Sequence, residues 1–154
     1  MRLTATRPQV SYQWRALAID EASYGDAHPK VARDLNNLAA LLRATNRLGD
    51  AEPLMRRALA IDEASYGDAH PEVATALYNL ARLLRATNRL GAAEPLMRRA
   101  LEVFLTFSRD TRHPHPHLNT VINGYGVLLV AMGNTQAEAA EKIRAMRAQY
   151  AVSI

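Results

Sequence analysis

Two stretches decide the fold of this chain: LNNLAALLRATNRLGDAEPLMRRALAI at Leu35–Ile61 and LYNLARLLRATNRLGAAEPLMRRALEV at Leu77–Val103. They belong to a longer tandem repeat, because a shift of 42 residues places Ala16–Arg57 on Ala58–Arg99 with only six mismatches. A fixed period of this length is typical of arrays in which each repeat is one supersecondary unit. The sequence therefore predicts a repeat protein.

A looser third copy follows, in which His115–Leu129 matches His70–Leu84 after a three-residue insertion. Apolar residues recur at i, i+3, i+4 and i+7 in the first helix of each copy, as helices require: Leu35, Leu38, Ala39, Leu42; Leu77, Leu80, Ala81, Leu84; Ile122, Tyr125, Gly126, Leu129. A second helix carries a similar stripe: Ala51, Leu54, Met55, Ala58, Ile61; Ala93, Leu96, Met97, Ala100, Val103. Each copy is thus predicted to be a pair of helices.

The stretch AIDEASYGDAHP occurs letter for letter at Ala18–Pro29 and Ala60–Pro71, and we interpret it as the joint between helix pairs. Its glycine is predicted to end one helix and its final proline to begin the next.

The turn inside each pair is TNRLG, where Gly49 or Gly91 should permit the reversal. Asp50 is expected to cap the following helix, with Pro53 in its first turn, where a missing N–H costs nothing.

These patterns predict an all-α fold, an α-α superhelix of three helix-turn-helix repeats preceded by one extra helix. The whole chain, 1–154, is expected to form a single domain. Its parts are a capping half-repeat helix at 9–25, repeat 1 at 29–67, repeat 2 at 71–108, and repeat 3 with the C-terminal cap at 115–150.

The two quoted stretches resemble tetratricopeptide repeats, specifically the 42-residue kind found in kinesin light chains. The resemblance covers about Ala16–Leu101 and is weaker over His115–Tyr150. The family's packing positions are occupied here by Leu77, Leu80, Ala81, Leu84, Leu90, Ala93, Met97 and Ala100. The resemblance implies a solenoid whose first helices line a concave groove.

A second stripe on each first helix lies two residues out of phase with the core stripe, about 200° around the helix axis. The resemblance implies that this stripe lines the groove, and that asparagines on it hold cargo peptides as in kinesin light chains. We call it the binding stripe. Its candidate peptide-binding residues are Arg33, Asn36, Asn37, Ala40, Arg43, Thr75, Tyr78, Asn79, Arg82, Arg85 and Asn123.

The chemistry of the stripe suits an extended, acidic peptide. The amides of Asn37 and Asn79 can bond a peptide backbone whatever its sequence. The arginines favour carboxylates, and Tyr78 offers an aromatic floor for an apolar anchor. Three of the six mismatches between the near-identical copies (33/75, 36/78 and 40/82) fall on this stripe. This concentration of differences indicates that the stripe contacts a ligand. The alternative is neutral sequence drift on an exposed face.

Catalysis and cofactors are not expected. The Asp, Glu, Ser and His of the joint occur once per repeat, so any chemistry would have to be duplicated, and no nucleophile–base–orienter set is visible. The run HPHPH at His113–His117 could hold a metal, but its alternating prolines splay the rings. We interpret it as a linker and predict no enzyme, no cofactor and no metal.

Composition sets the compartment and the partners. There is no cysteine and no long apolar run, and residues 1–10 lack the apolar segment that a signal peptide requires, so the chain is expected to be cytoplasmic, with no membrane partner. The net charge is +4, and the basic residues alternate with acidic ones instead of forming a block. This favours an acidic protein or peptide as partner and no nucleic acid. Nucleic-acid binding through the arginines is kept as a less favoured alternative, which requires steep salt dependence.

The first helix has no partner helix before it, which raises the alternative of a structural, self-assembling module. Gln9 and Gln13 stand where the next copy has the core residues Ala51 and Met55, which makes the uncovered face of the first helix more polar. Trp14 either folds over this end or marks a homo-oligomer contact.

Overall fold

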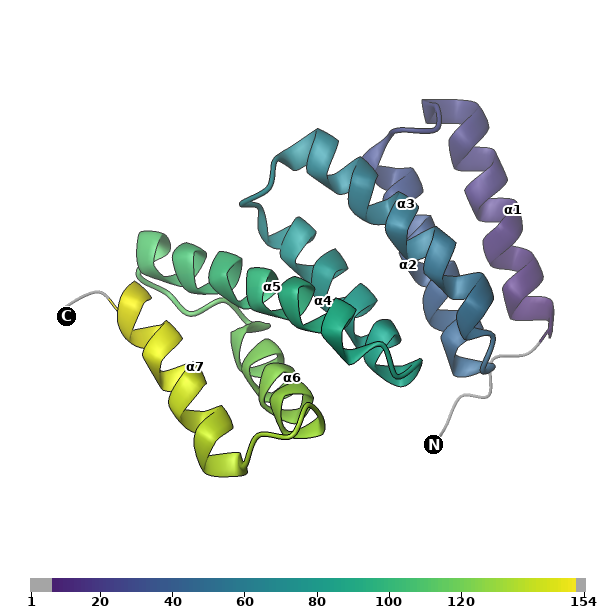
Figure 1. The fold of residues 1–154 in the computed structure, drawn as a ribbon. Helices are drawn as coiled ribbons and strands as arrows, with labels where there is room; N and C mark the ends of the chain where they lie inside the picture. The colour runs from purple at the N-terminus through teal and green to yellow at the C-terminus, as the bar shows by residue number, and fades with distance from the viewer. Residues whose placement is uncertain (1–6, 152–154) are drawn as a thin grey trace. The chain divides into compact units, whose positions relative to one another are not determined.

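The computed structural model describes residues 7–151, which form α-helices joined by short turns (Figure 1). The helices are α1 (Arg7–Tyr24), α2 (Pro29–Ala44), α3 (Leu48–Tyr66), α4 (Pro71–Ala86), α5 (Leu90–Thr111), α6 (Leu118–Ala131) and α7 (Gln136–Tyr150). Because residues 7–151 contain no strand, the predicted all-α class is confirmed. Residues 1–6 and 152–154 of the predicted domain lie outside the described part. Within that part, no helix has the length and apolar character needed to cross a bilayer.

The chain packs as two compact units, one ending at Asp68 and the other beginning at Ala69. In the first unit, α2 lies along α3 and α1 packs against α2. In the second, α4 lies along α5, α6 packs against both of them, and α7 contacts α6 and α5 (Figure 1).

The predicted apolar stripes form the cores of these units. Leu35, Leu38 and Leu42 of α2 are buried, and their copies on α4 are buried as well. The second helices contribute Met55 and Met97, each flanked by buried alanines. Burial of each such side chain contributes about 1.5–3 kcal/mol, so these stripes supply most of the favourable packing.

The joint between α1 and α2 follows the predicted pattern and adds a cap. Gly25 adopts φ +84° just after α1, and Pro29 opens α2. His28, which directly precedes α2, accepts the Lys30 N–H on its Nδ1 at 3.1 Å. The second joint, at 67–72, repeats all of these features. The repeated dodecapeptide is therefore a structural joint with a histidine N-cap.

The turn inside each helix pair differs from the prediction. Gly49 and Gly91 lie within α3 and α5, and the left-handed residues are Asn46 (φ +60°) and Asn88 (φ +59°). Asparagine is among the few residues that tolerate this conformation. The reversal therefore occurs three residues earlier than expected, and each second helix is correspondingly longer.

The expected cap of α3 was also wrong. The N-cap residue is Arg47, which makes no side-chain cap bond, and Asp50 lies within the first turn, where it accepts Arg47 Nε at 2.9 Å. Pro53 consequently falls in the second turn. There its missing N–H leaves the carbonyl of Gly49, four residues earlier, without its helical partner.

Helix α5 is the longest helix of the described chain, with 22 residues against 19 in α3. Where Gly67 ends α3, the equivalent residue Arg109 continues α5 for another three positions. The helix ends at Thr111, and the C-cap residue Arg112 is left-handed with φ +58°. The insertion before the third copy is therefore used to extend a helix.

Candidate peptide-binding surface

The binding stripe of the first unit lies on α2 with graded exposure. Arg33, Asn37 and Ala40 are exposed, whereas Asn36 and Arg43 are half-buried. Asn36 Oδ1 is shielded from solvent and has no hydrogen-bond partner in the structure. The polar side chains that remain accessible on this helix are those that a bound strand could reach.

Arg33 is surrounded by two carboxylates of the same unit. Its guanidinium lies 3.9 Å from Asp20 Oδ2 on α1 and 3.8 Å from Asp34 Oδ1 on its own helix. Burial raises the pKa of Asp34, and the neighbouring Asp20 carboxyl acts in the same direction, while Arg33 opposes both. Arg33 is thus partly occupied with its own chain.

The binding stripe of the second unit lies on α4, where all five predicted residues are half-buried: Thr75, Tyr78, Asn79, Arg82 and Arg85. The Thr75 hydroxyl donates to the Pro71 carbonyl at 3.1 Å, which engages its proton within the helix. The sixth predicted residue of this unit, Asn123, is exposed on α6.

Tyr78 contacts both its own helix and α6. Arg82 Cζ lies 5.5 Å from the centre of its ring, within the range of a cation–π interaction. The ring also lies close to Gly124 of α6, where an added Cβ would meet Tyr78 Cε2 at 2.7 Å. Only glycine leaves room for the ring there.

Gly126, two positions further along α6, is less crowded. A Cβ at Gly126 would lie 3.5 Å from Ile143 Cδ1, which is ordinary van der Waals contact. Spacing alone could not distinguish two glycines that lie two positions apart on one helix.

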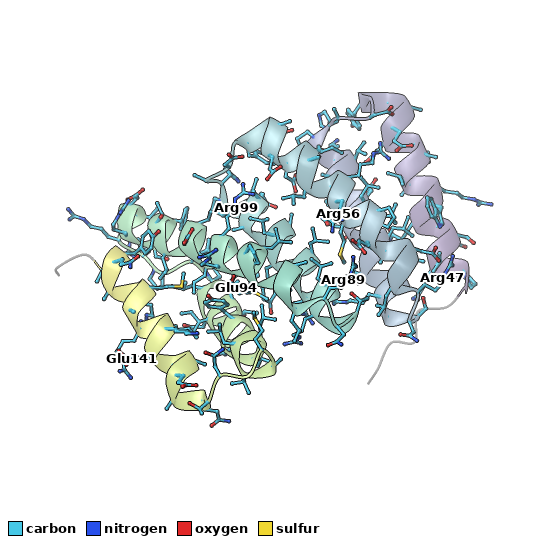
Figure 2. All side chains as sticks on the ribbon, in the orientation of Figure 1. Arg47, Arg56, Arg89, Glu94, Arg99 and Glu141 are labelled. Atoms are coloured by element: carbon cyan, nitrogen blue, oxygen red, sulfur yellow. The ribbon has the colours of Figure 1, made fainter. Side chains whose placement is uncertain are left out.

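Helix α6 is also tied to α5 by a buried tyrosine. Tyr125 Oη donates to Glu94 Oε1 at 2.7 Å (Glu94 is labelled in Figure 2). Burial raises the pKa of Tyr125, and the bond to Glu94 acts in the same direction, so the phenol stays protonated and keeps donating. This bond replaces the leucine contact of the earlier copies, which carry Leu38 and Leu80 at the equivalent position.

A groove of about 1470 Å³ lies between α5, α6 and α7 in the second unit, and we call it the C-terminal groove. Of the predicted site residues, Asn123 lines it and the others do not. Sequence reasoning missed this groove as a site, although Val127 and Val130 line it. The available signal was that these two valines stand where α4 has Arg82 and Arg85.

The histidine run packs the α5–α6 connection onto α5. The His115 ring lies 4.4 Å from that of Phe104, and its backbone N–H donates to Ser108 Oγ at 3.0 Å. Burial lowers the pKa of His115, and the charge of His117 acts in the same direction. Within residues 7–151, no group of three His, Asp or Glu side chains is placed to hold a metal ion.

Comparison with known proteins agrees with this architecture. The tetratricopeptide repeat family model matches residues 11–64 and 49–106. No curated protein matches the chain. Among solved structures, the repeats of a putative kinesin light chain from Podosopora anserina align with a TM-score of 0.77 at 21% identity, over 96% of this chain and 69% of that one.

A second similar structure is BtubC (BKLC) from P. vanneervenii, with a TM-score of 0.75 at 22% identity, over 92% of this chain. This chain spans 56% of the length of BtubC. The similarity extends along nearly the whole chain and confirms the predicted solenoid fold class and the resemblance to kinesin-light-chain-type repeats. Because the family model covers well over half of its residues, this protein belongs to the tetratricopeptide repeat family.

Proposed function

We propose that this protein is a non-catalytic adaptor that binds an extended, acidic segment of a partner protein along its binding stripe. The tetratricopeptide fold is that of a protein-interaction repeat module. The observation that carries the finer proposal is the arrangement on α4, where Tyr78 rests on Gly124 with Arg82 over its ring. An aromatic surface and a cation that are already in place lower the ordering cost of binding.

The polar groups around this pair support recognition of a peptide backbone and its carboxylates. Asn79 follows Tyr78 directly and is accessible, so its amide can both donate to and accept from a strand. Arg85 lies one turn beyond Arg82 on the same helix, so that two guanidinium groups can meet carboxylates along one peptide. Asn37 and Arg33 offer the same chemistry on α2.

Arg82→Glu is expected to weaken binding of an acidic peptide by at least about tenfold, because a charge-assisted hydrogen bond contributes about 1.5–3 kcal/mol. Asn79→Ala should weaken it by several-fold. The probe is a fluorescein-labelled, Glu-rich peptide with prolines at intervals, which stays extended, and fluorescence anisotropy gives Kd at a fixed salt concentration. A Lys-rich peptide of the same length should not bind.

Arg56→Glu on α3 is the matched control, because it makes the same charge change outside the stripe, at an exposed residue that pairs with Glu52 at 2.8 Å. It should leave the Kd within about twofold. Equal Kd values for Arg82→Glu, Arg56→Glu and the wild type would contradict the proposal.

The exposed apolar residues of α1 favour a second candidate, a homo-oligomer formed through that helix. Tyr12, Trp14 and Ile19 are all exposed large side chains. If α1 forms the contact, the wild type should behave as a dimer in size-exclusion chromatography with light scattering, and the Trp14→Ala variant as a monomer. A monomeric wild type at high concentration, or a dimer that persists in Trp14→Ala, would rule out this contact.

A further inference from the structure

The C-terminal groove has an apolar floor and a cationic rim. Val127 and Val130 of α6 line it and are 54% and 41% exposed. Ile122 and Ile143 also line its floor. Its ionic side chains are four arginines, Arg109 and Arg112 at the end of α5 and Arg144 and Arg147 on α7. Among residues 7–151, no Asp or Glu lines it. A groove of this volume exceeds the typical small-molecule pocket and suits several side chains of a peptide.

The position of the groove within the repeat indicates the secondary structure of its ligand. Helix α6 covers one face of the α4–α5 pair, where Leu101 and Phe104 are fully buried. Aligning Ile143 of α7 with Met97 of α5 places Arg147 at the position of Leu101 and Tyr150 at that of Phe104. Both of these α7 residues line the groove. The groove therefore occupies, on the α6–α7 pair, the place that a helix occupies on the preceding pair.

The rim arginines are available to a ligand. Arg112 and Arg147 have no acidic partner among the described residues. Arg109 pairs with Asp110 at 2.9 Å, and Arg144 pairs with Glu141, but all four side chains of these two pairs are largely exposed. Exposed pairs of this kind contribute at most about 1 kcal/mol. Carboxylates of a partner could therefore replace their present contacts at little cost.

We propose that the C-terminal groove binds an amphipathic helix of a partner protein, with aliphatic residues on one face and carboxylates along its borders. The aliphatic face covers Val127 and Val130, and the carboxylates meet the arginines of α5 and α7. This is helix-in-groove recognition, with anchors at i, i+3, i+4 and i+7. It shares Asn123 with the binding stripe but none of the stripe residues on α2 and α4, and it takes a helical rather than an extended ligand.

The test uses a fluorescein-labelled peptide of about 18 residues, or five helical turns, with Leu on one face and Glu on its flanks. Anisotropy should show saturable binding to the wild-type chain. Val127→Glu combined with Val130→Glu should weaken binding by more than about tenfold. The two substitutions remove two buried apolar contacts and place carboxylates opposite the glutamates of the peptide. Arg112→Glu combined with Arg147→Glu should also weaken it by at least about tenfold. All four positions are exposed, so folding should be retained, and circular dichroism checks this.

The controls separate this site from the part of the binding stripe that lies on α4. Arg82→Glu should not change the Kd of the helical peptide, and the valine variant should not change that of the extended peptide. A peptide of the same composition with its leucines scrambled should bind at least about tenfold more weakly. The proposal is overturned if the wild type does not bind the peptide, if the scrambled peptide binds equally well, or if the Val127/Val130 variant binds as the wild type does. It is also overturned if these valines mediate self-association of the free chain, since a second copy would then be the occupant.

Discussion

Ile61→Ala is expected to lower the free energy of unfolding by about 2–4 kcal/mol, whereas Ile19→Ala should change it by no more than about 0.5 kcal/mol. The two isoleucines lie at the same place in the identical twelve-residue stretches 18–29 and 60–71. Ile61 is 6% exposed and Ile19 is 64% exposed. Local sequence is therefore the same in both variants, and only the burial of the deleted side chain differs.

Urea unfolding followed by circular dichroism at 222 nm gives both free energies under the same conditions. Because the flanking residues are identical, helix propensity cancels in the comparison, and the difference reports tertiary burial alone. Equal destabilisation by the two variants would mean that Ile19 is covered in solution. That result would support an oligomer formed through α1.

Hydrophobic periodicity was sufficient to predict the helix pairs and most of their cores. A stripe such as Leu77, Leu80 and Leu84 can be buried only on one side of a helix, so the sequence defines which face points inward. The tandem copies added a second constraint, since any fold had to accommodate the same residues twice. Helix existence and the core were for this reason predictable without a structure.

The ends of the helices were less predictable, because several residue types can perform the same task. Gly49 and Asn46 are both able to adopt positive φ, and the asparagine does so. His28 is an unusual N-cap, since serine, threonine, aspartate and asparagine are preferred at that position. Its ring nitrogen nevertheless accepts the Lys30 N–H, a contact that depends on the exact path of the turn.

The C-terminal groove depends on the spacing between α6 and α7, which no local pattern encodes. Met132–Thr135 forms the connection, with Gly133 at φ +103° and a capping box between Thr135 and Glu138. The sequence predicted a capping helix after the third repeat. It could not show that α7 would leave Val127 and Val130 uncovered, because that depends on the direction in which the chain leaves the turn.

Asp34→Ala is expected to stabilise the protein at neutral pH by about 1–3 kcal/mol, which is unusual for a substitution at a buried position. Asp34 is 5% exposed, its Oδ2 has no hydrogen-bond partner, and it faces Asp20 of α1. The second copy of the repeat has Ala76 at this position. The substitution therefore introduces a residue that the same helix surface already accommodates.

The gain should depend on pH with a definite sign. The pKa of Asp34 is raised above its ordinary value of 3.8, mainly by burial and then by Asp20. A raised carboxyl pKa means that folding favours the protonated form, so the stability contributed by Asp34 is fully present below about pH 3.8 and is lost as the pH rises through the folded-state pKa. The advantage of Asp34→Ala over the wild type should thus be small in acid and grow toward neutral pH. Asp34→Asn, which removes the charge but keeps the shape, should show the same trend, and thermal melts across this pH range measure it. A melting temperature of Asp34→Ala that stays below that of the wild type at every pH would show instead that Arg33 and the two carboxylates form a net stabilising cluster.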